Sequence, residues 1–92
     1  EDVLTALRHP LRRKILKQLI GKDDAALSPR EVSEELDTPL SNVSYHVRVL
    51  VDCRALKLVR TKAVRGSIQH FYKPSPAFVA EPTVAMLLGL SK

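Results

Sequence analysis

The sequence has no tryptophan and only one cysteine, Cys53, among its 92 residues. A single cysteine excludes a disulfide within the chain and fits a reducing compartment. No apolar run approaches the roughly 20 residues of a membrane-spanning helix, so no association with a membrane is expected. No signal-peptide pattern opens the sequence, which begins with Glu1 rather than Met. Together these features favour a cytoplasmic protein.

Acidic residues are missing from a long stretch of the chain. Between Cys53 and Ala80 there is no Asp or Glu. The same stretch carries six basic residues: Arg54, Lys57, Arg60, Lys62, Arg65 and Lys73. A second basic group lies within residues 12–17, and the net charge is +5. This excess favours a polyanionic partner, although such clusters are often only solvated faces.

The residue patterns of enzymes and metal sites are also missing. No paired carboxylates, no nucleophile beside a base and no glycine-rich phosphate loop stands out, so we expect neither catalysis nor a cofactor. Cys53 could join His9 and His70 around a metal, but no ligand spacing supports a metal site. Cys53 is better explained as a small, half-buried apolar residue.

Apolar residues make up 45% of the chain, enough for one small domain, which we expect to span residues 1–92. Residues 2–8 and the segment after Pro10 predict two helices, because the residue before a proline avoids the helical region. Gly21 is expected to cap the end of the second helix.

Residues 28–53 predict a helix-turn-helix. Ser28 and Glu31 form the pattern of a capping box at the start of its first helix. The Asp-Thr-Pro sequence that follows ends this helix, and Thr38 is expected to cap the next one.

The second helix of this pair is predicted from about Leu40 to Cys53. His46 lies at the edge of its core side and is expected to be a hydrogen-bonded structural histidine. Four apolar residues at helical spacing share the side that must face the core: Leu40, Val43, Val47 and Leu50.

The opposite face of this helix is unusual for a surface that meets only water. Ser41, Tyr45, Arg48 and Asp52 fall on this face, and Asn42 and Ser44 flank them. Apart from Asp52 at its end, the face thus carries hydroxyls, an amide, an aromatic ring and an arginine. The major groove of DNA admits an α-helix, whose side chains then read base edges by hydrogen bonding. Short polar groups can approach the bases closely, whereas acidic ones would be repelled by the phosphates. We therefore predict that these five residues contact DNA, rather than forming an ordinary polar face.

After Leu56 the apolar periodicity changes to that of strands. Residues 56–61 and 67–73 flank Arg65-Gly66, which predicts a β-hairpin, or wing, over about residues 56–73. Phe71 and Tyr72 are expected to pack at its base. Four basic residues, three of them on or beside the hairpin tip, complete the predicted DNA contacts: Arg30, Arg60, Lys62 and Arg65.

The chain ends in an apolar segment over about residues 77–91, with a short helix expected after Pro82. Too many of its positions are apolar for an exposed tail, which indicates a partner surface. We expect this segment to pair with the first helix across a two-fold axis. The predicted dimer contacts are Val3, Leu4, Leu7, Val84, Leu87 and Leu88.

The order of helices, turn and hairpin is that of a winged helix-turn-helix. Three segments together resemble the ArsR-like winged helix-turn-helix transcriptional regulators: ALRHPLRRKILKQL, SPREVSEELDTPLSNVSYHVRVL and LKLVRTKAVRGSIQHFYK. The resemblance covers roughly residues 5–73, and its most specific part is the S-x-x-S-x-H pattern from Ser41 to His46. It implies a mostly α-helical fold with a small β-hairpin. It also implies a homodimer that binds double-stranded DNA at an inverted repeat.

Two residues depart from the pattern of this family. Family members often have glycine after the recognition helix, where this chain has Arg54, so a left-handed turn there would be strained. Metal-sensing members often carry paired cysteines, whereas this chain has Cys53 alone.

Two other interpretations stay open. Winged helices also serve as protein-interaction modules without specific DNA binding, and fold alone does not fix function. A small-molecule effector could also act at the dimer interface, although the sequence identifies none.

Overall fold

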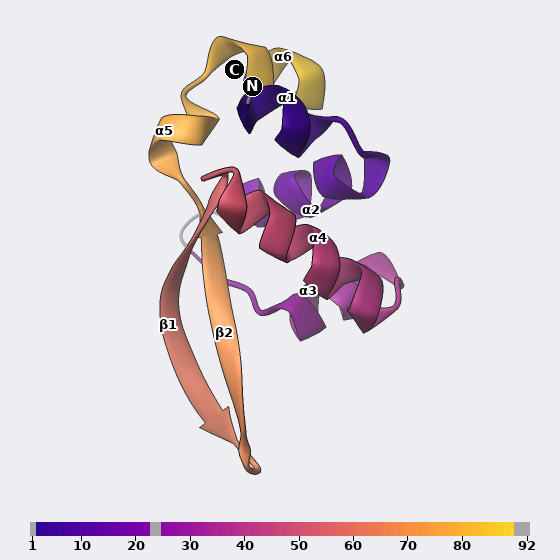
Figure 1. The fold of residues 1–92 in the computed structure, drawn as a ribbon, viewed down its shortest axis with the longest axis vertical. Coiled ribbons are helices and arrows are strands. Elements are labelled where there is room, and N and C mark those ends of the chain that lie inside the picture. The colour runs from indigo at the N-terminus through magenta and orange to yellow at the C-terminus, as the bar shows by residue number, and fades with distance from the viewer. Residues whose placement is uncertain (1, 23–24, 90–92) are drawn as a thin grey trace.

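The computed structural model describes residues 2–22 and 25–89, which form six helices and one two-stranded antiparallel sheet. In chain order the elements are α1 (Asp2–Leu7), α2 (Pro10–Ile20), α3 (Pro29–Leu36), α4 (Leu40–Asp52), β1 (Leu56–Val64), β2 (Ser67–Pro74), α5 (Pro76–Val79) and α6 (Pro82–Leu88). The predicted winged helix-turn-helix, mostly helical with one hairpin, is confirmed. The wing projects from one end of the molecule, and α1 and α6 lie at the other (Figure 1).

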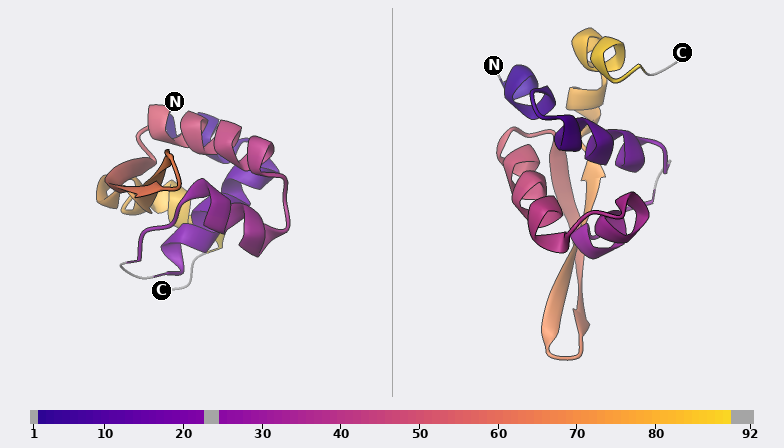
Figure 2. Two further views of the ribbon diagram at one scale, coloured as in Figure 1. Left: turned by 90° about the horizontal axis from the view of Figure 1, so that it is seen from below. Right: turned by 90° about the vertical axis from the view of Figure 1, so that its right-hand side faces the viewer.

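The core packs α2, α3 and α4 together and extends to residues of α1, α5 and α6. Figure 2 shows the arrangement of these helices from two further directions. Ile15 and Leu16 of α2, Val32 of α3, and Val43 and Leu50 of α4 are all at most 1% exposed. Each such side chain contributes about 1.5–3 kcal/mol when it leaves water. These helices therefore form the rigid base on which the outer face of α4 is presented.

The two ends of α3 are fixed by local hydrogen bonds. The Ser28 amide donates to Glu31 Oε1 (2.9 Å), and the Glu31 amide donates to Ser28 Oγ (3.2 Å), which confirms the predicted capping box. The predicted cap of α4 is wrong: Pro39 holds the cap position without a side-chain bond, and the Thr38 hydroxyl donates to the Leu36 carbonyl instead. Thr38 is engaged by the helix before it, because that helix ends in a left-handed turn at Asp37 (φ 51°).

Leu40 also departs from its prediction. Its side chain is 37% exposed, whereas Val43, Val47 and Leu50 are buried as expected. Leu40 is the first residue of α4 and lines the open cleft beside the wing instead of the core. Gly21 caps α2 as predicted, but in a right-handed conformation (φ −72°).

The end of α4 is held by a left-handed turn at Arg54, whose φ is 63°. The Arg54 amide donates to the Val51 carbonyl (3.0 Å), and the Ala55 amide donates to the Leu50 carbonyl (2.9 Å). This bonding pattern is a Schellman motif, which usually places glycine at the left-handed position. Arg54 therefore has the strained left-handed conformation that was anticipated. The completely buried Ala55 keeps the backbone of Arg54 in this conformation.

The wing is a long hairpin closed by Arg65 and Gly66. Both have positive φ, 50° and 83°, as a two-residue hairpin turn with the twist of the strands requires. The strands are longer than predicted, and their pairing shifts between Leu58 and Arg60, where Val59 is the extra residue of a β-bulge. At the base of the wing Leu27 pairs with Tyr72 through two backbone hydrogen bonds, an isolated bridge that sequence analysis missed.

The terminal helices pack on each other within one chain, which corrects part of the predicted dimer surface. Leu7, Val84 and Leu88 are at most 3% exposed, so they cannot face a partner. Val3 is partly buried against the same core. Leu4 and Leu87 are 55% and 51% exposed, because each points away from the contact between α1 and α6. Residues 90–91 of the predicted dimerisation segment lie outside the described residues.

Candidate nucleic-acid interface

The outer face of α4 presents all five of its predicted contact residues. Ser41, Asn42, Ser44, Tyr45 and Arg48 are exposed, and Tyr45 is 61% exposed. Ser41, Tyr45 and Arg48 lie on the side of the helix opposite its buried apolar residues, and Asn42 and Ser44 flank them. The only acidic residue of this helix is Asp52, at its last position. The face can therefore approach a polyanion with hydrogen-bonding groups and without a carboxylate near its centre.

A buried contact between α2 and α4 fixes how this face is oriented. Arg12 Nη1 donates to His46 Nδ1 (3.1 Å), and both residues are only 9% exposed. The ring of His9 lies 4.2 Å from that of His46, and the ring of Tyr45 meets it edge-on at 5.0 Å. His46 is thus the hydrogen-bonded structural histidine that was predicted.

The chemistry of this contact requires a neutral His46. Arginine only donates hydrogen bonds, so His46 Nδ1 must carry a lone pair and no proton. Burial, with smaller contributions from His9 and Arg12, lowers the pKa of His46 and so favours the neutral form. Arg12 Nε is buried and has no hydrogen-bond partner among the described residues. The recognition face is therefore supported by a cluster of basic side chains.

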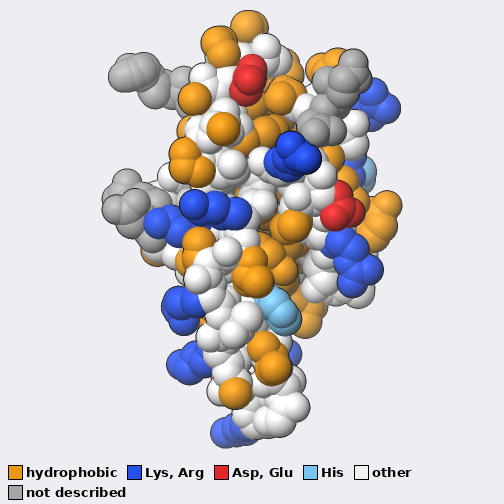
Figure 3. All heavy atoms as spheres, turned by 60° about the vertical axis from the view of Figure 1, so that its left-hand side comes forward, with side chains coloured by type: hydrophobic (Ala, Val, Ile, Leu, Met, Phe, Trp, Pro, Cys, Tyr) orange, Lys and Arg blue, Asp and Glu red, His pale blue; other side chains and the backbone are white. Residues whose placement is uncertain are grey.

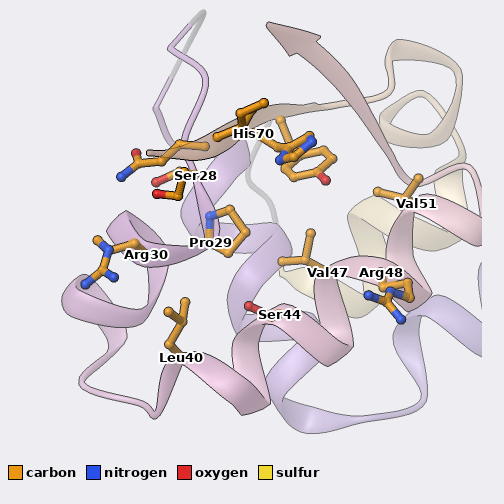
Figure 4. Close-up of a pocket in the computed structure, with 13 residues that line it drawn as sticks. Ser28, Pro29, Arg30, Leu40, Ser44, Val47, Arg48, Val51 and His70 are labelled. Atoms are coloured by element: carbon orange, nitrogen blue, oxygen red, sulfur yellow. The ribbon is translucent and has the colours of Figure 1, made fainter. Parts of the chain in front are cut away.

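A cleft of about 500 Å³ separates the helix-turn-helix from β2 (Figure 4). Its apolar lining includes Leu40, Val47 and Val51 from α4 and Ile68 from the wing. Its polar groups come from the start of α3, from α4 and from β2: Ser28, Arg30, Ser44, Arg48, Ser67, Gln69 and His70. Three predicted DNA contacts, Arg30 of α3 and Ser44 and Arg48 of α4, are thus brought to the same cleft.

Of the three basic residues predicted at or beside the hairpin tip, two lie there and one does not. Lys62 and Arg65 are exposed near the tip as predicted. Arg60 is not at the tip: it pairs with Phe71 well inside the hairpin, and its guanidinium lies 4.0 Å from the centre of the Phe71 ring. Phe71 is 6% exposed although it lies outside the main apolar core. Lys and Arg side chains follow one side of the wing, whereas apolar and histidine side chains gather on the other (Figure 3).

The described part of the chain forms neither a cluster of metal ligands nor a membrane-spanning helix. In residues 2–22 and 25–89, no three His, Cys, Asp or Glu side chains are close enough to hold a metal ion. Cys53 is 7% exposed, more deeply buried than expected. Within the same ranges, no helix is both long and apolar enough to cross a bilayer.

A family model for the helix-turn-helix domain matches residues 7–59, more than half of the chain. The chain belongs to the helix-turn-helix domain family. The matched segment runs from the end of α1 through α4 into β1, so it contains both helices of the helix-turn-helix, α3 and α4. A comparison of the sequence with curated proteins gives no match.

Solved structures of several regulators share the fold of this helix-turn-helix protein. The transcriptional repressor PagR of Bacillus anthracis is 25% identical, with 96% of this chain and 86% of PagR covered and a TM-score of 0.67. A possible transcriptional regulator from Methanosarcina mazei Go1 is 16% identical, with 96% and 71% covered and a TM-score of 0.68. A homodimeric winged helix-turn-helix DNA-binding domain from Mycobacterium bovis, a possible ArsR-family regulator, is 19% identical, with 97% and 70% covered and a TM-score of 0.66.

The family model confirms the helix-turn-helix, and the solved structures share the winged fold that the resemblance to ArsR-like regulators implies. Sequence analysis of this helix-turn-helix protein missed the contact between Arg12 and His46, which lie 34 positions apart. It also missed the part of the cleft formed by Ser67, Gln69 and His70. The alternation of strand residues could have placed His70 on one face with Tyr72, but it could not have shown which face meets α4.

Proposed function

We propose that this protein binds double-stranded DNA as a homodimer and reads an inverted repeat with α4. The observation that carries the proposal is the exposed face of α4, where five polar side chains stand together with no carboxylate before Asp52. The capped start of α3 and strand β2 of the wing line the cleft beside this face. Side chains from α4 would contact base edges in the major groove, and basic residues of the wing would contact phosphates.

Exposed apolar residues support the homodimer. Leu4 of α1 and Met86 and Leu87 of α6 are 55%, 74% and 51% exposed. They belong to the end of the molecule opposite the wing (Figure 1). A two-fold axis at this end would bury them and leave the two wings at the outer ends of the dimer. Two copies of α4 would then enter major grooves about 34 Å apart, one turn of DNA, which requires an inverted repeat.

The structural relatives agree with this mode of action. The Mycobacterium bovis domain is homodimeric and binds DNA, and PagR is a transcriptional repressor. We propose that the present protein likewise regulates transcription and acts in the cytoplasm, where bacterial and archaeal DNA is found. The mechanism needs no catalytic step and no cofactor.

The test is a selection of binding sites from random duplexes, followed by fluorescence anisotropy titration of the enriched duplex at two salt concentrations. We expect an inverted repeat bound by two chains, with specific affinity at least about 10³-fold above that for random duplex. Uniform weak binding to every duplex would overturn the proposal. It would favour the alternative, a winged-helix module that binds another protein.

A further inference from the structure

The cleft between α4 and β2 exposes apolar side chains to water. Its volume of about 500 Å³ lies within the range of about 300–1,000 Å³ that is usual for small-molecule sites. Leu40 and Ile68, which line it, are 37% and 63% exposed, and Val51 is only partly buried. The phosphate backbone of DNA is too polar to cover such groups favourably. They favour a ligand that has an apolar part of its own.

The charged side chains among the lining residues are both cations. Arg30 of α3 and Arg48 of α4 line the cleft, and no Asp or Glu does. In the view of Figure 4 the two arginines lie on opposite sides of the cleft, with Leu40, Ser44 and Val47 between them. In the part of the chain that the structure describes, neither guanidinium forms an ion pair or a hydrogen bond. The cleft therefore offers two uncommitted positive charges beside an apolar lining.

The start of α3 also borders the cleft, but it is already capped. The backbone amide and the hydroxyl of Ser28 are both hydrogen-bonded to Glu31 in the capping box. A helix N-terminus that is satisfied by its own carboxylate has little left for an external anion. An anion in the cleft would instead pair with Arg30 or Arg48, because a planar guanidinium matches the geometry of a carboxylate or a similar oxyanion.

Strand β2 supplies the opposite wall of the cleft. Gln69, His70 and Tyr72 line it, with hydrogen-bonding groups and two rings. Tyr72 is fixed by its backbone: its amide donates to the Leu27 carbonyl (2.9 Å), and its carbonyl accepts from the Leu27 amide (3.1 Å). This bridge ties the wall to the segment before α3. A flat apolar ligand could therefore stack on a ring whose backbone is held in place.

We propose that this cleft binds a small organic anion with a flat apolar body, and that the bound ligand excludes DNA. The inference rests on the proposed function, in which Arg30, Ser44 and Arg48 contact DNA. A ligand paired with either arginine occupies a group that DNA also uses, so the two compete. The protein would then release its operator in response to the ligand without any change at the dimer interface.

The probe for this site is anilinonaphthalene sulfonate (ANS), a fluorescent aromatic anion. A fluorescence titration of the wild-type protein should show saturable binding of one ANS per chain. The selected duplex, which is the one that the binding-site selection enriches, should displace it. In anisotropy titrations, ANS at about nine times its own Kd should weaken binding of the selected duplex by at least about tenfold, as competition for one site requires.

Ile68→Gln removes an apolar group from the cleft. The side chain is exposed, so the variant should be about as stable as the wild type in urea denaturation. It should bind ANS about fivefold to tenfold more weakly, because part of one apolar contact is lost. Val59→Gln is the matched control, since Val59 is also an exposed β-branched residue of the wing but does not line the cleft. The control should bind ANS like the wild type. Arg48→Gln should weaken ANS binding and reduce its dependence on salt.

Three results would each overturn the inference. The first is ANS binding that does not saturate at one molecule per chain. The second is ANS binding that Ile68→Gln leaves unchanged, or that both wing variants weaken equally. The third is a complex that holds ANS and the selected duplex together.

Each of these results leaves the proposed function standing if the wild-type protein still binds the selected duplex specifically. Absence of specific DNA binding by the wild-type protein without ANS would instead contradict the proposed function. The ANS titrations of the two wing variants would then still decide whether the cleft is a ligand site.

Discussion

Replacing Arg54 by glycine is expected to stabilise the protein. Arg54 has φ 63°, a left-handed conformation in which a side chain with a β-carbon costs about 1–2 kcal/mol. Glycine avoids this cost but loses more backbone freedom on folding, which removes about 0.5–1 kcal/mol of the gain. The net expectation for Arg54→Gly is an increase of about 0.5–1 kcal/mol in the free energy of unfolding. Arg54 itself is exposed, so little packing is removed by the substitution.

Two variants separate backbone strain from the loss of charge. Arg54→Ala removes the same charge but keeps a β-carbon, so it should stay close to the wild type. Gly66→Ala should destabilise the protein, because Gly66 has φ 83° and an added β-carbon there meets no other atom within 4 Å, which leaves conformation as the main effect. The assay is urea denaturation at fixed protein concentration, followed by circular dichroism. Equal stability of Arg54→Gly and Arg54→Ala would refute the reasoning.

Three further predictions concern assembly, pH and metals. Leu87→Glu should shift the homodimer to monomer in analytical ultracentrifugation at micromolar concentration, whereas Thr83→Glu, an exposed polar position of α6, should not. Folding lowers the pKa of His46 below its unfolded value of 6.5. The contribution of neutral His46 to stability is therefore fully present above pH 6.5 and is lost as the pH falls from 6.5 toward the pKa of the folded state. His46→Gln should remove this part of the pH dependence of unfolding, and His70→Gln, in the exposed wing, should retain it; the opposite pattern would contradict the assignment. Zinc or arsenite at stoichiometric concentration should not release the protein from DNA, and release in an anisotropy titration would show a metal site that the described residues do not form.

Local signals in the sequence predicted the features that depend on neighbouring residues. The capping box of Ser28 and Glu31 and the turn at Arg65-Gly66 each need only a few adjacent residues, and both are present. The helical spacing of the apolar residues correctly separated the buried side of α4 from its exposed side, except at Leu40. Fold and recognition face followed from these local patterns.

Features that depend on tertiary contacts could not be predicted in this way. Val84 and Leu88 are as apolar as Leu87, and only the packing of α6 on α1 decides that the first two are buried within the chain. The bulge at Val59 has no signature in the sequence, yet it shifts the pairing of β1 with β2. The hydrogen bond from Arg12 to His46 likewise depends on how α2 crosses α4.

The central claim is that α4 contacts base edges while the wing contacts the DNA backbone. A comparison of two alanine variants, one in α4 and one in the wing, tests this claim most directly. Binding of Arg48→Ala and Arg65→Ala to the selected duplex and to random duplex is measured over a range of salt concentrations. Arg48→Ala should cost about 1–3 kcal/mol on the selected duplex and less on random DNA, which narrows the specificity ratio. Arg65→Ala should weaken both about equally and reduce the salt slope by about 0.9 for each phosphate that is no longer neutralised. A collapse of the specificity ratio in Arg65→Ala, with only a reduced salt slope in Arg48→Ala, would contradict this division of roles.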